Sequence, residues 1–279
     1  MKMDIQEVLT EIRLSGKVIP ITGGDVNQNY RIEEQQKSYF LKIHPHVTKR
    51  FFEAEVDGLK ELAPHVRVPE TYMLGETNEG AYLLMEWIEP GKGDPRELAK
   101  DLVKIHRSTA PQFGFRKDNY LGSLPQLNTF EEDWWTFFFK NRLEAQIDIA
   151  EKNNRWNETR EKEYQRLKKE LLNRDDHRKI TPSLLHGDLW SGNVFYDRQG
   201  RPVFIDPAVS YGNREQDIAM SQLFGGFRPE FLEAYQESWP LEEGWESRLP
   251  LYQLYYLLAH LNMFGESYGT QVDHILMKK

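Results

Sequence analysis

The stretch of residues 184–207 constrains the fold of this chain more than any other. It places His186, Asp188 and Asn193 after one apolar run, and Asp206 after another. The apolar segments on either side of a polar turn between Asn193 and Asp206 predict an antiparallel hairpin. Such a hairpin brings Asn193, at the start of one strand, beside Asp206, at the end of the other. Their side-chain oxygens suit a hard cation such as Mg2+, which binds one or two carboxylates together with substrate phosphates.

Asp188 lies in the loop before this hairpin, where it can face a hydroxyl group. A His-x-Asp sequence, an Asn five residues later and an Asp one hairpin further on are typical of a kinase catalytic loop. We therefore predict that Asp188 is the catalytic base or orienter, that Asn193 and Asp206 bind metal, and that His186 supports the loop. Turn capping explains any one of these residues alone. It does not explain the four together at these spacings.

Composition excludes several other classes of protein. The chain has 279 residues, 39% of them hydrophobic, which is enough for a large core. It has no cysteine, so a disulfide framework, a thiolate nucleophile and a zinc-thiolate site are excluded. The net charge of -8 argues against a nucleic-acid partner. We find neither a signal peptide nor a run of about 18 apolar residues. We expect a cytoplasmic monomer without a membrane or nucleic-acid partner.

The N-terminal third reads as antiparallel strands followed by one helix. Lys42 lies between Leu41 and Ile43, so on a strand it faces away from both. The helix predicted over residues 48–63 carries Glu55 at the border of its apolar face, where an unpaired carboxylate is costly. We predict that Lys42 pairs with Glu55 and binds the nucleotide phosphates, as the strand lysine and helix glutamate of kinases do. Glu53 is the alternative partner.

Two further segments complete the predicted nucleotide site. The turn at Gly23 and Gly24 lets backbone N–H groups approach phosphates, although it also suits a plain hairpin. An apolar strand ends in Glu86, Trp87 and Ile88, whose backbone is predicted to bond adenine, and runs into a Pro- and Gly-rich linker. We place a hinge at residues 86–94. It separates an N-terminal nucleotide-binding lobe (1–89) from a C-terminal lobe with the catalytic and substrate site (90–279).

The C-terminal lobe reads as mostly helical. An unusually long loop spans residues 111–128, and loops of that length are usually functional. Thr129 and Glu132 predict a capping box for a helix that reaches Asn153. The aromatic residues near its start are read as core, with an aromatic binding wall as the alternative. Asp217, beside apolar neighbours, is expected to accept hydrogen bonds from the catalytic-loop backbone. The predicted fold is α+β: a bilobal, protein-kinase-like fold with an antiparallel N-terminal sheet plus helix and a helical C-terminal lobe.

The chain resembles the fructosamine kinase (ketosamine kinase) family, within the fold shared by aminoglycoside phosphotransferases, choline kinases and protein kinases. Gly187 stands where protein kinases have Arg, which fits the small-molecule branch. The stretches most similar to fructosamine kinases are LHGDLWSGN at 185–193, DPAVSYGNRE at 206–215, DNYLG at 118–122 continuing to Gln126, the segment 252–260, and FEAE at 52–55.

The resemblance implies ATP- and Mg2+-dependent phosphorylation of a sugar hydroxyl on a ketosamine, an amine or protein lysine that carries a rearranged sugar. The phosphorylated adduct then breaks down and frees the amine, a deglycation repair step. Trp190 is similar to the family's substrate-stacking Trp, and an indole ring also packs well on the apolar face of a sugar. Residues 23–27 depart from what the resemblance implies. The family often has a Gly-rich stretch with Ser or Cys there, and this chain has neither residue at these positions.

Two other functions stay open from sequence. One is a kinase of another small hydroxyl compound, such as an aminoglycoside or a choline-like molecule. The other is a binding module on a kinase fold without catalysis, which is disfavoured because every expected catalytic position is filled. The preferred sugar, and whether the amine is free or part of a protein, are not specified by the sequence.

Overall fold

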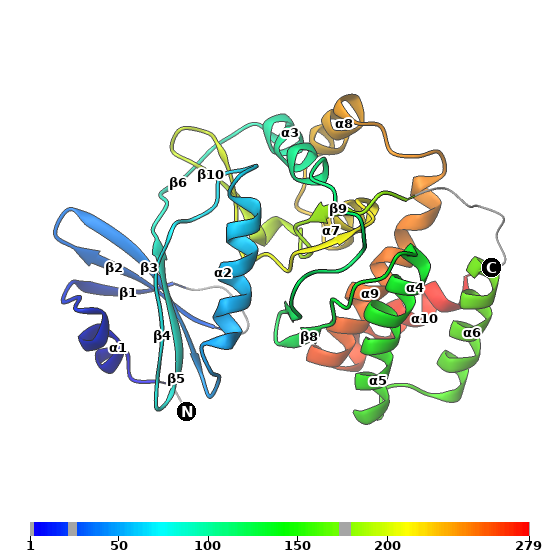
Figure 1. Cartoon of the computed structure of the whole chain (residues 1–279), viewed down its shortest axis with the longest axis horizontal. Helices are drawn as coiled ribbons and strands as arrows, with labels where there is room; N and C mark the ends of the chain where they lie inside the picture. Colours follow the sequence, from blue (N-terminus) through cyan, green and yellow to red (C-terminus); the bar gives the residue numbers. More distant parts are fainter. Residues whose placement is uncertain (1–2, 22–26, 173–179, 279) are drawn as a thin grey trace. The chain divides into compact units, whose positions relative to one another are not determined.

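The computed structural model describes residues 3–21, 27–172 and 180–278. The chain divides into two compact units (Figure 1). Unit 1 comprises Met1–Asp94 with Val194–Pro207, and unit 2 comprises Pro95–Asn193 with Ala208–Lys279. An antiparallel sheet organises unit 1 and helices dominate unit 2, which confirms the α+β class. The predicted lobes, 1–89 and 90–279, are contiguous stretches and stay a prediction.

The main sheet of unit 1 has five strands in the order β1-β2-β3-β5-β4, and all neighbours are antiparallel. The strands are β1 (Lys17–Ile21), β2 (Gln28–Glu34), β3 (Lys37–Pro45), β4 (Thr71–Thr77) and β5 (Gly80–Glu86).

Two helices lie on opposite faces of this sheet, α1 (Ile5–Ile12) and α2 (Arg50–Leu62) (Figure 1). Apolar residues of α1 pack with Leu41 and Ile43 of β3 in one buried cluster. Each fully buried aliphatic side chain contributes roughly 1.5–3 kcal/mol. Because side chains alternate along a strand, burying Leu41 and Ile43 against α1 turns Lys42 toward the face that α2 covers.

The predicted hairpin is confirmed. It consists of β10 (Val194–Asp197) and β11 (Pro202–Phe204), which pair antiparallel with Val194 opposite Phe204. Asp197 holds the turn, since its carboxylate accepts hydrogen bonds from the backbone N–H of Gln199 and Arg201, both at 2.9 Å. The linker after β5 contributes β6 (Pro90–Gly91), which pairs with the outer edge of β10.

Unit 2 is built mainly from helices, and its described residues include two short strand pairs. Its helices are α3 (Pro95–His106), α4 (Trp134–Phe138), the π-helix η1 (Phe139–Glu144), α5 (Ala145–Lys152), α6 (Glu158–Leu172), the 3-10 helix η2 (Ser191–Asn193), α7 (Glu215–Leu223), α8 (Pro229–Ser238), α9 (Trp245–Phe264), the 3-10 helix η3 (Glu266–Tyr268) and α10 (Gly269–Met277). The strand pairs are β7 (Asn119–Leu121) with β8 (Leu124–Gln126), and β9 (Ser183–Leu185) with β12 (Ser210–Gly212).

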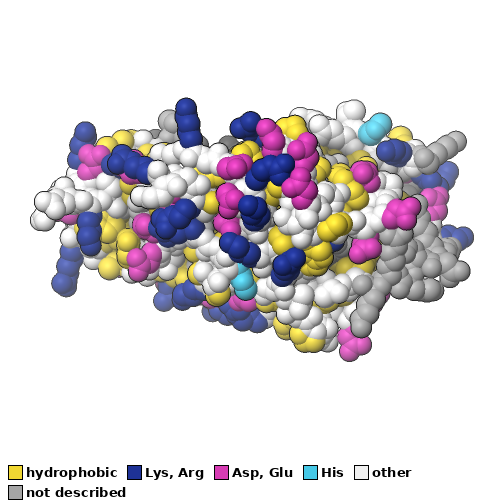
Figure 2. Space-filling model, turned by 90° about the horizontal axis from the view of Figure 1, so that it is seen from above, with side chains coloured by type: hydrophobic (Ala, Val, Ile, Leu, Met, Phe, Trp, Pro, Cys, Tyr) yellow, Lys and Arg dark blue, Asp and Glu magenta, His cyan; other side chains and the backbone are white. Residues whose placement is uncertain are grey.

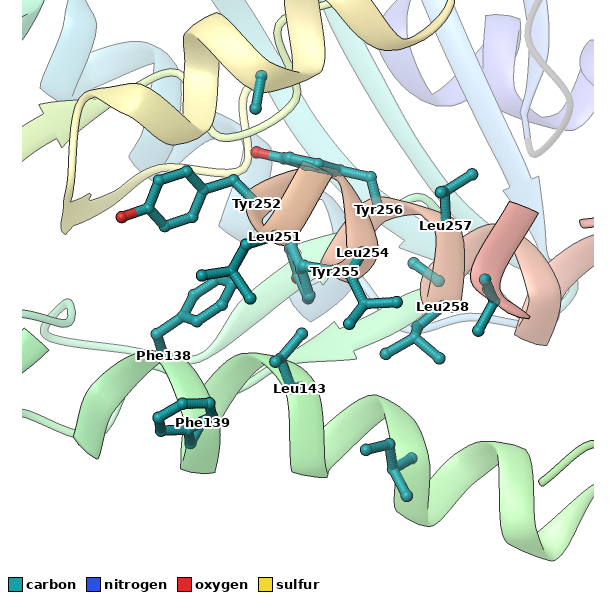
Figure 3. Packing of buried hydrophobic residues seen from close by; sticks show 14 of the residues in the cluster. Phe138, Phe139, Leu143, Leu251, Tyr252, Leu254, Tyr255, Tyr256, Leu257 and Leu258 are labelled. Atoms are coloured by element: carbon teal, nitrogen blue, oxygen red, sulfur yellow. The ribbon is translucent and has the colours of Figure 1, made fainter. Parts of the chain in front are cut away.

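The main core of unit 2 lies between α9 and the α4–η1–α5 segment. Figure 3 shows Phe138, Phe139 and Leu143 on the side of α9 that carries Leu254 and Leu258. Trp134 and the phenylalanines that follow it are buried in this cluster. The interpretation of these aromatic residues as core is therefore confirmed.

The predicted capping box at Thr129 is wrong. The helix begins at Trp134, and the carboxylate of Asp133 caps it by accepting a hydrogen bond from the backbone N–H of Thr136 at 2.7 Å. Glu131, next in the chain after Phe130, instead exchanges backbone hydrogen bonds with Phe113. That pairing holds Glu131 in a β-bridge, so the helix starts only after it. The predicted continuous helix is also interrupted by the π-helical turn η1.

Charged side chains of both signs are interspersed on the face seen in Figure 2. Exposed side chains of unit 2 form ion pairs with one another, such as Arg96 with Glu237 at 2.8 Å and Lys100 with Glu97 at 2.7 Å. Exposed pairs of this kind contribute about 0–1 kcal/mol each. Among the helices that the structure describes, none has the length and apolar character needed to cross a membrane.

Candidate active site

The loop at residues 186–188 is held by Asp217 at the start of α7. The two carboxylate oxygens of Asp217 accept hydrogen bonds from the backbone N–H of His186 (2.7 Å) and of Gly187 (2.9 Å). All three residues belong to unit 2, and the Asp217 and His186 side chains are fully buried. The hydrogen bonds predicted for Asp217 are therefore present. They hold the backbone immediately before Asp188 and so fix the direction in which the Asp188 side chain points.

A buried chain of hydrogen bonds in turn orients Asp217. Arg214 donates to the Tyr235 hydroxyl (3.1 Å), Tyr235 lies 2.8 Å from His106 Nδ1, and His106 Nε2 lies 3.1 Å from Asp217. Because the hydroxyl accepts from Arg214, its own proton is left for His106 Nδ1, so Nε2–H donates to Asp217. Burial lowers the pKa of His106, which favours this neutral form. Sequence reasoning treated His106 as structural but did not find these partners.

Gly187 is required by its backbone conformation and by its surroundings. Its φ is +86°, and a Cβ atom there would lie 1.9 Å from the carbonyl oxygen of Ala208. Ala208 also donates its backbone N–H to the carbonyl of His186 at 2.9 Å. On the other side, the Tyr256 hydroxyl of α9 donates to the Gly187 carbonyl at 3.1 Å. The catalytic loop is thus clamped between residue 208 and α9.

Substituting Gly187→Ala is expected to destabilise the protein by more than about 2 kcal/mol, because the methyl group displaces the Ala208 backbone as well as straining φ. Gly225→Ala is the matched control. Gly225 also has positive φ, +71°, but nothing lies within 4 Å of the position that its Cβ atom would take. Thermal unfolding of both variants separates two contributions to the loss of stability. Strain from positive φ affects both positions, whereas the steric clash with Ala208 affects only position 187. Equal losses at the two positions would contradict the clamp.

The Asp188 carboxylate is oriented by Asn193. The Asn193 amide donates to the Asp188 carbonyl (2.9 Å) and to its carboxylate Oδ2 (3.0 Å). Using its N–H groups this way leaves the Asn193 amide oxygen as an acceptor. Trp190, between them, is 40% exposed and covers Gly192, where a Cβ would lie 2.2 Å from the indole ring. The loop therefore presents one carboxylate, one amide oxygen and one aromatic ring.

In unit 1, the predicted pair of Lys42 and Glu55 is present, with Nζ and Oε1 2.7 Å apart. Lys42 also pairs with Asp206, a contact that sequence reasoning missed. Burial alone would lower the pKa of Lys42, but Asp206 and then Glu55 outweigh it, so the net pKa lies above its ordinary value. Burial raises the pKa of Glu55 to about 7, against the opposing attraction of Lys42. One buried cation is thus shared by two carboxylates.

This arrangement makes stability depend on pH through Glu55. Its folded pKa of about 7 exceeds the ordinary value of 4.5, so the stabilisation from its bound proton is present below pH 4.5 and is lost as pH rises through about 7. Glu55→Gln cannot ionise. The stability difference, wild type minus variant, should therefore fall by up to about 3 kcal/mol between pH 4.5 and 8.

Thermal or urea unfolding of the metal- and nucleotide-free protein measures this difference. Glu53→Gln, on the same helix and also half-buried, is the control. It shows how far the loss of a carboxylate from this helix changes unfolding by itself. An offset from wild type that stays constant with pH for Glu55→Gln would remove Glu55 as the titrating group.

Asp206 has an unusual backbone conformation, with φ at +54°. It follows β11, whose Phe204 donates its backbone N–H to the Arg67 carbonyl at 3.0 Å. Positive φ in a residue other than glycine costs about 1–3 kcal/mol and persists only where the surroundings impose it. The Asp206 side chain is 39% exposed. A strained carboxylate that remains accessible is a candidate metal ligand.

The proposed hinge residues lie at the end of β5. The Glu86 backbone N–H donates to the Glu70 carbonyl at 2.8 Å, while its side chain pairs with Arg67. Trp87 stacks on Phe40 with ring centroids 6.2 Å apart. Trp87 and Ile88 are half-buried. The adenine contacts predicted for residues 86–88 stay a prediction, and Gly23 and Gly24 lie outside the described residues.

The two predicted metal ligands are both oxygen donors, Asn193 in unit 2 with an amide oxygen and Asp206 in unit 1 with a carboxylate. Mg2+ accepts such oxygen ligands when phosphates and water complete its shell. Within residues 3–21, 27–172 and 180–278, no group of three or more His, Cys, Asp or Glu side chains is arranged to hold a metal ion. A metal held by protein ligands alone therefore does not fit the described residues.

The fold and this loop define a phosphotransferase of the protein-kinase-like class. The fructosamine kinase family model matches residues 1–279, and the chain belongs to that family. A probable ketoamine kinase from Enterococcus faecium is 73% identical and aligns over 98% of this chain and 99% of that protein. A chloroplastic protein-ribulosamine 3-kinase from Arabidopsis thaliana is 35% identical over 93% of this chain and 81% of that protein.

Solved structures agree with this assignment. A putative fructosamine-3-kinase from Haemophilus somnus superposes with a TM-score of 0.84 at 27% identity, covering 97% of this chain and 94% of that one. The aminoglycoside phosphotransferase APH(2")-IIa, solved as a gentamicin complex, gives a TM-score of 0.69 at 16% identity and covers 100% and 98% of the two chains. The second likeness shows the shared fold alone.

Proposed function

We propose that this protein transfers the γ-phosphoryl group of ATP to a sugar hydroxyl of a ketosamine. The observation that carries this proposal is the hydrogen bond from the Asn193 amide to the Asp188 carboxylate (3.0 Å), in a loop that Asp217 anchors. It leaves one carboxylate aimed by its neighbour and one amide oxygen available for a cation. The match to the fructosamine kinase family over the whole chain supports a ketosamine as the acceptor.

The transfer assigns one role to each side chain. The substrate hydroxyl oxygen bonds to the γ-phosphorus, the bond from that phosphorus to the bridging oxygen breaks, and ADP leaves. Asp188 orients the hydroxyl and accepts its proton, which later passes to water. Lys42, held by Glu55, binds the phosphates of the nucleotide. Trp190 offers its exposed ring to the apolar face of the sugar.

Asn193 and Asp206 are the residues that would hold Mg2+. When bound, the ion neutralises charge on the transferring phosphates. Asp206 also pairs with Lys42, so the candidate metal ligand lies beside the lysine that is proposed to bind the phosphates. The names of the relatives, ketoamine kinase and protein-ribulosamine 3-kinase, support the substrate class and suggest the ribulose adduct as the first to test.

The deciding experiment measures ADP formation with Mg2+ and ATP on lysine adducts of ribulose, fructose and erythrulose, and on an aminoglycoside and choline as controls. We expect turnover on at least one ketosamine, followed by release of the free amine. Turnover on a control compound alone would keep the phosphotransferase and reject the ketosamine. ATP binding without any turnover would favour a binding module.

We also propose that the protein acts as a cytoplasmic monomer without a nucleic-acid or membrane partner. The lack of cysteine fits a reducing compartment, and the net charge of -8 argues against a nucleic-acid partner. Sedimentation of the purified protein tests whether it is a monomer. Fractionation of the source cells tests whether it is cytoplasmic.

A further inference from the structure

Four buried polar side chains of unit 2 form a cluster, the polar cage, beside the segment that follows Asp206. The cage consists of Asn119, Gln126, Asn128 and Arg142, each at most 5% exposed. Three of these come from the long loop and its strands β7 and β8, and Arg142 comes from the π-helix η1. None of them had a role in the sequence-based site.

The cage binds three consecutive residues of the chain. Gln126 Nε2 donates to the Ala208 carbonyl at 3.0 Å, and Asn119 Nδ2 donates to the Val209 carbonyl at 2.8 Å. The Arg142 guanidinium donates to the Ser210 hydroxyl at 3.0 Å. Residues 208–210 begin directly after Asp206 and Pro207, so the cage fixes the chain on the C-terminal side of the candidate metal ligand.

The cage side chains also bond one another, which makes the group rigid. The Asn119 side-chain oxygen accepts from Gln126 (2.8 Å) and from Asn128 (2.9 Å), and Asn128 in turn accepts from Arg142 (2.9 Å). The Tyr255 hydroxyl of α9 donates to the remaining oxygen of Gln126 at 2.7 Å. Each of the three amide side chains therefore uses both its oxygen and its nitrogen.

Arg142 is the most unusual member. It is 1% exposed, yet among the described residues no carboxylate lies within ion-pair distance of it. Its guanidinium instead lies 4.6 Å from the Phe137 ring centroid and bonds carbonyl and hydroxyl oxygens. Burial of a charge without a directly paired counter-ion is costly, and the more distant carboxylate of Asp118 offsets only part of this cost. The π-helical turn that delivers Arg142 is itself rare and is often found at functional sites.

The polar cage lies where it can restrain the strained backbone of Asp206. A φ of +54° needs restraint on both sides. On the N-terminal side, Asp206 follows β11 of the hairpin. On the C-terminal side, Ala208 bonds the His186 carbonyl, and the cage fixes residues 208–210. We propose that Gln126, Asn119 and Arg142 are positioning residues that hold the Asp206 backbone in this conformation and so direct its carboxylate for metal binding. This inference rests on the proposed metal role of Asp206.

The test compares Gln126→Met with Gln146→Met. Gln146 is a matched control because it is 1% exposed, lies in the same unit, and accepts a hydrogen bond from Asn262 at 3.0 Å. Two measurements need no ketosamine: hydrogen exchange of the peptide 204–214 in the ligand-free protein, and calorimetric binding of a non-hydrolysable ATP analogue over a range of Mg2+ concentrations.

We expect Gln126→Met to speed exchange in 204–214, and to raise the Mg2+ concentration for half-maximal binding, each on the order of tenfold. Gln146→Met should change neither, even if its melting temperature falls as much. Equal behaviour of the two variants would reduce the cage to a stabilising role and overturn the proposal.

Ser210→Ala provides a second variant if Gln126→Met fails to fold. It removes the Arg142 contact to the segment and leaves the bonds within the cage intact. A raised Mg2+ requirement at wild-type melting temperature supports the proposal, and an unchanged requirement opposes it. If the wild type does not phosphorylate ketosamines but these shifts occur, the proposed substrate fails while the positioning role stands.

Discussion

Substituting Asp188→Asn is expected to lower kcat on a ketosamine by roughly 10²–10⁴-fold, the usual contribution of a positioned acid or base. The amide matches the carboxylate in shape, and the backbone bonds from Asp217 that hold the loop do not involve the Asp188 side chain. Binding of ATP should therefore stay within about twofold of wild type, since no phosphate contact is removed. Steady-state kinetics and calorimetry measure the two effects separately.

Asp148→Asn is the control for this substitution, because Asp148 is an exposed carboxylate on α5 of the same unit. It should retain wild-type kcat. Near-normal turnover by Asp188→Asn would mean that the hydroxyl is oriented by another group. A large loss of ATP binding by Asp188→Asn would instead mean that Asp188 takes part in binding the nucleotide.

Substituting Asp206→Asn is expected to weaken Mg2+-dependent ATP binding by roughly 10²-fold or more, since a metal clamp on phosphate is worth several kcal/mol. Asparagine tolerates positive φ better than most residues, so the variant removes the charge and spares the backbone at φ +54°. Lys42 keeps Glu55 as its partner at 2.7 Å, so the fold of unit 1 should survive.

The matched control for this substitution is Glu33→Gln in the same unit. Glu33 is 37% exposed and pairs with Arg31 at 3.3 Å, so the control also removes one partly exposed ion pair. Its Mg2+-dependent binding should equal that of wild type. If Asp206→Asn bound the Mg2+ complex of ATP as tightly as the control does, the metal assignment would be refuted.

Local rules of the chain were enough to predict much of unit 1. Strand alternation and the apolar face of α2 placed Lys42 beside Glu55, since each rule needs only a few neighbouring residues. The hairpin that follows Asn193 was predictable for the same reason, with its polar turn between two apolar segments. The pairing of Lys42 with Asp206 joins residues 164 positions apart, and neither pattern contains that information.

The polar cage escaped sequence analysis for a similar reason. Gln126 and Ala208 are 82 positions apart, and no periodicity links them. The only signals in the sequence were the length of the loop at 111–128, which contains β7 and β8, and its likeness to the family over residues 118–126. The capping error at Thr129 has a different cause. Several adjacent polar residues can cap a helix, and the pairing of Glu131 with Phe113 decided in favour of Asp133.

The chain crosses between the two compact units three times, at 94/95, 193/194 and 207/208. Unit 1 therefore takes its β10–β11 hairpin from the middle of the sequence. No single cut produces either unit complete, because a fragment that ends at Asp94 lacks the hairpin and the remainder carries it without the partner strand β6. The two halves are not modules that recombination can exchange by one crossover. Truncation libraries should accordingly yield no soluble half, whereas insertions at surface turns within one unit should be tolerated.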